Sequence, residues 1–209
     1  MTSAPPLVVA LTGATGMIYG VRLLELLRAA GVPSHLVMSK WAIQTLLHEI
    51  GHALGLKHPH EPGGGGFNAM PLDRDSVEYT VMSYRSDVGS GTGGYTIGGT
   101  SYPQTLMMYD IAALQTLYGA NYNTNSGNTV YSWDPSTGQT FINGVSMGAV
   151  AGNKIFLTIW DGGGVDTYDM SNYTNDVRIS LSPGGSSITS ETQRANLGNS
   201  QKATGNVYN

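Results

Sequence analysis

The stretch HEIGHALGLKH, residues 48–58, combines three histidines and one glutamate at spacings that suit a metal site. On a helix, His48 and His52 are one turn apart and face the same way, so both imidazoles can reach one metal ion. Glu49 lies beside them, where it can take a proton from a metal-activated water. This short pattern also occurs by chance, so the residues that follow it decide the interpretation.

Gly55 allows the backbone to end the helix and turn sharply, which a residue with a β-carbon resists. The turn would bring His58 back towards the same ion as a third ligand. Three neutral imidazoles with an open fourth position describe a catalytic zinc site. The alternative is a set of surface or packed helix histidines, which is how we interpret His35 and His60, because neither fits a ligand position.

The composition excludes several other classes of protein. The chain has 209 residues, of which 40% are hydrophobic and only 11% are charged, and it is rich in glycine. Abundant Gly, Ser, Thr and Asn is typical of extracellular β-rich proteins. A net charge of −4 with scattered basic residues argues against a nucleic-acid partner. The absence of cysteine from the sequence excludes disulfides, thiolate zinc sites and cysteine nucleophiles.

No targeting or membrane segment is predicted. The apolar run at residues 7–11 has no Lys or Arg before it and is short for a signal peptide. No apolar run is long enough to span a bilayer.

The resemblance to a known family rests on four pieces of sequence. H-E-x-x-H-x-x-G-x-x-H marks the metzincin zinc endopeptidases. KHPHEP, YTVMSYRS and MYDIAALQTLYGAN resemble the serralysins, the bacterial secreted metalloproteases of that superfamily. The resemblance implies a zinc endopeptidase acting on polypeptides. It also implies that Met82 is the Met-turn residue, a soft apolar floor beneath the imidazoles, and that Tyr84 binds zinc or the transition-state oxyanion. Without the resemblance, Met82 would be interpreted as an ordinary loop methionine and Tyr84 as a packing residue.

The segment TIWDGGGVDTYDMSNY, residues 158–173, resembles the place where serralysins enter a calcium-binding β-roll. Asp161, Asp166 and Asp169 would offer the hard oxygen ligands that calcium prefers. A solvated acidic turn is the alternative, and the G-G-x-G-x-D repeats of the β-roll are missing from the sequence.

The N-terminal LTGATGMIYG, residues 11–20, places glycines between a predicted strand and a predicted helix, where backbone N–H groups can hold a phosphate. It is not the dinucleotide fingerprint G-x-G-x-x-G. Together with HLVMSKWA it resembles UbiX-type flavin prenyltransferases, which implies FMN contacts at Gly13, Thr15 and Ser39. A strand–helix–strand fragment without a ligand is the alternative.

We therefore predict an α+β chain that joins parts of two families. Residues 1–42 are expected to form a βαβ fragment of a flavodoxin-like parallel sheet. Residues 43–120 are expected to form a metzincin-like zinc-helix and Met-turn subdomain. Residues 121–209 are expected to be β-rich and to lead towards a calcium β-roll. The fragment at 1–42 stands where serralysins have the N-terminal half of the catalytic domain, so we expect zinc to bind and proteolysis to be impaired.

Three functions follow from these features. The first is a serralysin-type zinc endopeptidase, which would be secreted. The second is an FMN-binding, flavin prenyltransferase-like protein, which would be cytoplasmic. The third is a non-catalytic metal-binding β-rich module. Neither a nucleic-acid partner nor insertion into a membrane is expected for any of them.

Overall fold

The computed structural model describes residues 6–11, 17–62 and 68–209. These residues fall into two compact units, one ending at Ile50 and the other running from Gly51 to Asn209. Helices and several small sheets are both present, so the predicted α+β class is confirmed. The division of the chain at residues 42 and 120 stays a prediction.

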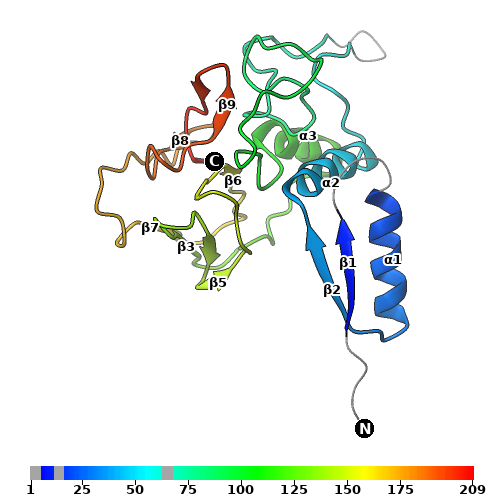
Figure 1. Cartoon of the computed structure of the whole chain (residues 1–209). Coiled ribbons are helices and arrows are strands. Elements are labelled where there is room, and N and C mark those ends of the chain that lie inside the picture. The colour runs from blue at the N-terminus through cyan, green and yellow to red at the C-terminus, as the bar shows by residue number, and fades with distance from the viewer. Residues whose placement is uncertain (1–5, 12–16, 63–67) are drawn as a thin grey trace. The chain divides into compact units, whose positions relative to one another are not determined.

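The first unit is a strand–helix–strand fragment. Strands β1 (Leu7–Leu11) and β2 (Ser34–Met38) pair in parallel, and helix α1 (Met17–Ala29) connects them and runs alongside (Figure 1). Parallel neighbours need such a crossover, since a tight turn only joins antiparallel strands. The helix approaches β1 closely, because a β-carbon on Gly20 would collide with the side chain of Leu11.

A glycine lies just beyond the end of helix α1. Gly31 adopts a φ of +67°, a conformation that glycine takes without steric cost. The N–H of Gly31 donates to the carbonyl of Arg28 at 3.1 Å, and the N–H of Val32 donates to Leu27 at 2.9 Å. These bonds satisfy carbonyls at the end of the helix that have no partner within it.

Apolar side chains of this fragment remain exposed, among them Val8 (61%) on β1 and Leu36 and Val37 on β2. A parallel sheet is normally covered on both faces. These exposed side chains are compatible with a fragment of a larger sheet, which stays a prediction. Its assignment to a flavodoxin-like sheet stays a prediction.

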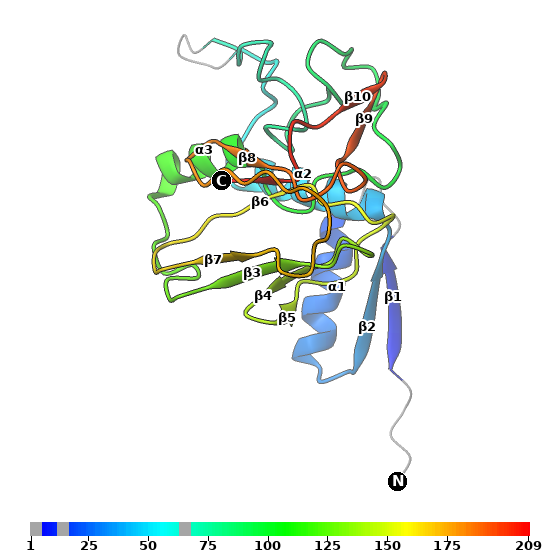
Figure 2. The ribbon, with the colours of Figure 1, turned by 90° about the vertical axis from the view of Figure 1, so that its left-hand side faces the viewer.

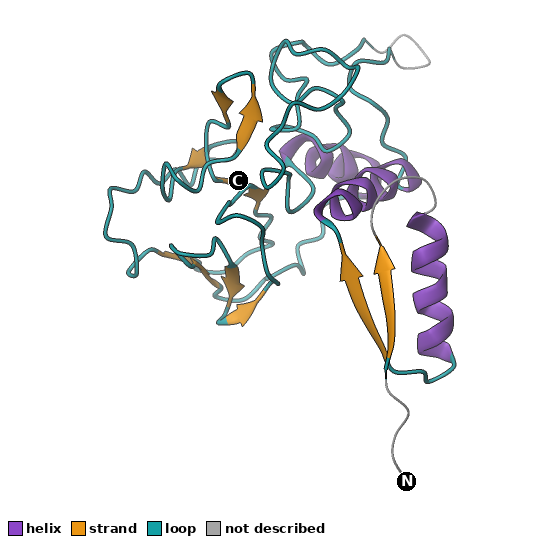
Figure 3. Cartoon of the chain, in the orientation of Figure 1, coloured by secondary structure: helices purple, strands orange, loops and turns teal. Residues whose placement is uncertain are grey.

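The second unit begins within helix α2 (Lys40–Ala53) and includes one further helix, α3 (Met108–Tyr118). The described residues between the two helices form turns and loops rather than helices or strands (Figure 3). Gly119, with a φ of +83°, ends α3, and its N–H donates to the carbonyl of Gln115 at 2.9 Å. Helix α3, like α1, is therefore followed by a glycine with a positive φ.

The chain after α3 is β-rich, as predicted. Its strands are short and have the following bounds: β3 Val130–Trp133, β4 Thr140–Ile142, β5 Val145–Ser146, β6 Leu157–Thr158, β7 Thr167–Asp169, β8 Ser186–Ser187, β9 Asn196–Gly198, β10 Gln201–Lys202 and β11 Val207–Tyr208. They form sheets in the orders β5-β4-β3-β7, β6-β11-β8 and β10-β9. Figure 2 shows β3, β4, β5 and β7 side by side. Pairing is antiparallel except for β3 with β7 and β6 with β11, which are parallel.

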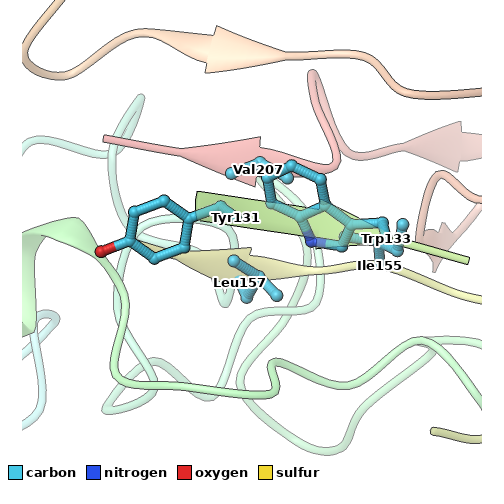
Figure 4. Close-up of a cluster of buried hydrophobic side chains, with 5 residues drawn as sticks. All are labelled: Tyr131, Trp133, Ile155, Leu157 and Val207. Atoms are coloured by element: carbon cyan, nitrogen blue, oxygen red, sulfur yellow. The ribbon is translucent and has the colours of Figure 1, made fainter. Parts of the chain in front are cut away.

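The core of this part joins two of the sheets. Five buried side chains from β3, β6, β11 and the residues before β6 pack together (Figure 4): Tyr131, Trp133, Ile155, Leu157 and Val207. Burying large aromatic side chains of this kind supplies much of the stability of a small core.

Two segments with an apolar alternation typical of strands, residues 154–160 and 177–182, form little regular strand. KIFLTIW contributes only the two residues of β6, and VRISLS makes only a single bridge, between Arg178 and Ile188. Side chains take the place of a neighbouring strand in the first case. The N–H of Phe156 donates to the side-chain oxygen of Gln104 at 3.3 Å, and that of Thr158 donates to the hydroxyl of Thr105 at 2.9 Å.

One buried carboxylate connects distant parts of the second unit. Glu78 is only 4% exposed and belongs to residues 75–86, which we call the Met82 segment. Its Oε1 accepts hydrogen bonds from the N–H of Thr204 at 3.0 Å, from the Thr204 hydroxyl, and from the hydroxyl of Tyr208 at 3.0 Å. The Met82 segment is thereby tied to β11.

Within the described parts of the chain, none of the helices is long and apolar enough to cross a bilayer.

Candidate metal centre

Helix α2 carries two of the candidate ligands on one face. The helix begins after Ser39, whose hydroxyl accepts a hydrogen bond from the N–H of Ala42 at 3.1 Å and so caps its first turn. His48 and His52 lie one turn apart on the continuous helix. His48 is 8% exposed, whereas His52 is exposed. Glu49, the neighbour of His48, is also exposed.

The turn at Gly55 brings the third histidine back. Gly55 has a φ of +88°, and the N–H groups of Gly55 and Leu56 donate to the carbonyls of His52 and Gly51, both at 2.9 Å. After this turn the ring of His58 lies edge-on to that of His52, with their centroids 4.7 Å apart. The glycine is therefore needed for its backbone conformation.

The three histidines fit a zinc ion. One ring nitrogen from each of His48, His52 and His58 lies within 4.8 Å of the other two. The Nε2 atoms of His52 and His58 are 3.1 Å apart. With Zn–N distances of about 2.0–2.1 Å, two imidazole nitrogens on one tetrahedral zinc are about 3.3 Å apart. The described donor set therefore has the chemistry and the spacing of a three-histidine metal centre.

A hydrogen bond orients one of these rings, and a carboxylate lies beside another. The Nδ1–H of His52 donates to the carbonyl of Leu56 at 3.0 Å, which leaves the lone pair on Nε2. The Nδ1 of His58 lies 3.0 Å from Oε1 of Glu61. The His58 imidazole holds the pKa of the Glu61 carboxyl below its ordinary value. Glu61 was not predicted from the sequence, although it is an acidic residue three positions after His58.

Met82 and Tyr84 both lie close to the candidate ligands. Met82 is fully buried, and its sulfur occupies the space that a β-carbon on Gly51 would need. Gly51 is the residue before His52 on α2. The ring of Tyr84 lies 4.4 Å from that of His58, between centroids, and its side chain is 36% exposed. These positions are compatible with the roles that the serralysin resemblance predicts for Met82 and Tyr84.

The contact between Gly51 and Met82 predicts an effect on stability. A Gly51→Ala substitution adds a methyl group where the buried Met82 sulfur lies, so we expect a loss of about 1–3 kcal/mol in the free energy of unfolding. Chemical denaturation of the two single variants and of Gly51→Ala/Met82→Ala gives the coupling between them. The double variant should be more stable than the sum of the single effects predicts. Additive effects would contradict the close contact.

The Met82 segment is braced by two buried carboxylates. Asp110, on the first turn of α3, accepts hydrogen bonds from the Thr80 hydroxyl at 2.5 Å, the Val81 N–H at 2.8 Å and the Met107 N–H at 2.8 Å. Burial raises the pKa of Asp110 above its ordinary value. The same carboxylate thus caps α3 and fixes the residues just before Met82.

The second brace is Asp75. It accepts hydrogen bonds from the Ser83 hydroxyl at 2.6 Å and from Nε of Arg85 at 2.9 Å. These residues flank Tyr84 on both sides, so the brace fixes the backbone from which Tyr84 projects. Neither Asp75 nor Asp110 was assigned a role from the sequence, because their partners are defined only by the fold.

The predicted calcium ligands have partners within the protein. Asp161 accepts hydrogen bonds from the Tyr131 hydroxyl at 2.6 Å and the Gly163 N–H at 2.8 Å. Asp166 accepts one from the Thr129 N–H, and Asp169 one from the Ser171 N–H, both at 2.9 Å. Among the described residues, two groups of three side chains could hold a metal ion, and both consist of histidines or of histidines and Glu61. Neither group includes these aspartates. Calcium binding at Asp161, Asp166 and Asp169 stays a prediction.

The residues of the alternative FMN interpretation are not brought together as a site. Gly13 and Thr15 lie outside the described residues. Ser39 is described, and its hydroxyl caps α2. This role in the helix explains Ser39 without a flavin, and FMN binding stays an untested alternative.

Comparison with known proteins points to the metallopeptidases. The family described as "Metallo-peptidase family M12B Reprolysin-like" matches residues 28–95, which include α2, the three histidines, Met82 and Tyr84. The family described as "Peptidase M10 serralysin C terminal" matches residues 120–192 in the β-rich part. These two matches support a metzincin-type metallopeptidase.

Individual relatives agree with the family matches. The chain is 42% identical over 142 residues to "Metalloprotease AprA" of Pseudomonas entomophila (strain L48), which is 66% of this chain and 28% of that protein. It is 41% identical over 145 residues to "Serralysin C" of Dickeya chrysanthemi, a match that covers 68% of this chain and 29% of that protein. It is 37% identical over 144 residues to "Serralysin" of Proteus mirabilis, a match that covers 67% of this chain and 28% of that protein. The chain thus spans less than a third of the length of the relatives it matches. These similarities lend no support to the flavin prenyltransferase resemblance, and the reprolysin-like match begins inside α1.

Proposed function

We propose that the chain is a zinc-dependent endopeptidase of the serralysin type, with His48, His52 and His58 as zinc ligands. The observation that carries the proposal is the 3.1 Å separation of the His52 and His58 Nε2 atoms, in a cluster that includes His48. The similarity to named metalloproteases over two thirds of the chain supports it.

The protein residues would divide the chemistry of peptide hydrolysis between them. When bound, zinc supplies a Lewis acid that polarises the substrate carbonyl and acidifies water. Glu49 takes the proton of the attacking water and gives it to the leaving amine. The Tyr84 hydroxyl, beside His58, donates a hydrogen bond to the oxyanion as negative charge develops.

A largely apolar pocket of about 700 Å³ adjoins His58 and supports a polypeptide as substrate. Its walls come from the turn after α2 and from α3, and include Leu56, Pro59, Met70, Ala113 and Leu117. A pocket of this size has room for an apolar side chain of a bound peptide together with the backbone beside it. Truncated peptides that lack such a side chain should therefore be poor substrates.

The test begins with the metal. We expect about one zinc per chain by elemental analysis after exhaustive dialysis, and chelator-sensitive cleavage of denatured casein. His58→Ala should lower zinc affinity by about 100-fold or more, because a three-ligand site becomes a two-ligand site. His35→Ala, which changes an exposed histidine on β2, is the matched control. A parent chain without zinc would overturn the proposal, and zinc without cleavage would favour the non-catalytic metal-binding module.

Calcium dependence and secretion are further predictions of this proposal. Both come from the serralysin resemblance of the sequence. Calcium would bind at Asp161, Asp166 and Asp169, and its removal would be detected as a lower unfolding temperature in a calcium chelator that leaves zinc in place.

A further inference from the structure

A second group of metal-ligand side chains lies next to the first. His58, His60 and Glu61 each place one ligand atom within 4.8 Å of the other two. The rings of His58 and His60 are nearly parallel, with an interplanar angle of 8° and centroids 5.4 Å apart. His60 and Glu61 are not among the candidate ligands of the three-histidine centre, so this group is a separate ligand set that shares His58 with it.

His60 has an unsatisfied nitrogen in this group. Its Nδ1 atom is buried, and no described residue forms a hydrogen bond with it. A buried polar atom without a partner is uncommon and costs free energy. A bound metal ion would satisfy this nitrogen.

The two nitrogens of His58 face the two different sets. Nε2 lies 3.1 Å from Nε2 of His52, whereas Nδ1 lies 3.0 Å from Oε1 of Glu61. A neutral imidazole has one lone pair, so it can serve only one metal at a time. His58 can therefore belong to either set, but not to both at once.

We propose that His58, His60 and Glu61 form a second binding site for a divalent transition metal, which takes His58 from the first site when metal is in excess. Two imidazoles and one carboxylate are donors that suit zinc, cobalt, nickel and copper. The site uses neither His48 nor His52, so its existence does not depend on the proposed function. Filling it would leave the first site with two histidines.

The decisive experiment removes the first site and keeps the second. A His48→Ala/His52→Ala variant should still bind about one Co²⁺ per chain, measured by calorimetry and by the visible absorption of cobalt. Adding His60→Ala should weaken this binding by about tenfold or more. Adding His35→Ala instead is the matched control and should change nothing. A double variant that binds no cobalt, or one whose binding survives His60→Ala, would overturn the proposal.

The parent chain gives a second test that does not require altering α2. Titration with zinc should show a second, weaker equivalent in the parent that is lost in His60→Ala. If the parent is a peptidase, excess zinc should inhibit it, and His60→Ala should resist that inhibition. A single equivalent in the parent at saturation contradicts the second site, whereas two equivalents without casein cleavage contradict only the proposed function.

Discussion

Glu49→Ala is expected to keep its zinc and to lose cleavage of denatured casein by about 10²–10⁴-fold, the usual contribution of a positioned general base. Glu49 directly follows the candidate ligand His48, but it is exposed and is not part of the three-histidine group. Its removal should therefore leave the metal content unchanged. Elemental analysis and an initial-rate assay on the same preparation separate the two effects.

The matched control for this change is Asp176→Ala. It removes the same charge from an exposed position in the β-rich part of the chain. It should retain the parent rate. A Glu49→Ala protein that cleaves casein as fast as the parent would exclude Glu49 as the base, even if zinc is bound.

Asp110→Ala is expected to cost about 3–5 kcal/mol in the free energy of unfolding, because three donors lose a buried acceptor. These donors are the Thr80 hydroxyl and the N–H groups of Val81 and Met107. The loss should also loosen the residues before Met82, so zinc affinity should fall although Asp110 is not a ligand. Urea denaturation and zinc titration measure the two effects.

Asp110→Asn is the conservative comparison for this position. Its amide oxygen can still accept from the two backbone N–H groups, so we expect less than half of the destabilisation seen with alanine. If alanine and asparagine are equally harmless to stability, Asp110 does not brace the Met82 segment. If both destabilise equally, the charge matters more than the acceptor geometry.

The grouping of the three histidines could be predicted from the sequence because the features that produce it are local. His48 and His52 follow from the period of one helix, and Gly55 from the conformation that a tight turn requires. The ends of α1 and α3 at Gly31 and Gly119 follow from the same property of glycine. Each of these features depends on only a few neighbouring residues, so the sequence of a short segment is enough to predict it.

The partners that support the centre could not be predicted in this way. Asp110 lies about thirty residues from the hydrogen-bond donors Thr80 and Val81, and nothing in the sequence between them specifies the pairing. The lengths of the strands could not be predicted from the sequence for a similar reason. Side chains of Gln104 and Thr105 bond to the backbone of KIFLTIW, so an apolar alternation became a two-residue strand.

The tie between Glu78 and the end of β11 determines the order in which the protein can be completed. Glu78 and Thr204 are 126 residues apart in the chain. During synthesis, the helix and turn that carry the histidines leave the ribosome long before Thr204 and Tyr208 do. Protein chains are synthesised at about 5–20 residues per second. The Glu78 carboxylate therefore obtains its partners Thr204 and Tyr208 only after the residues between them have been made. The histidines are therefore synthesised before the Met82 segment has all of its hydrogen-bond partners.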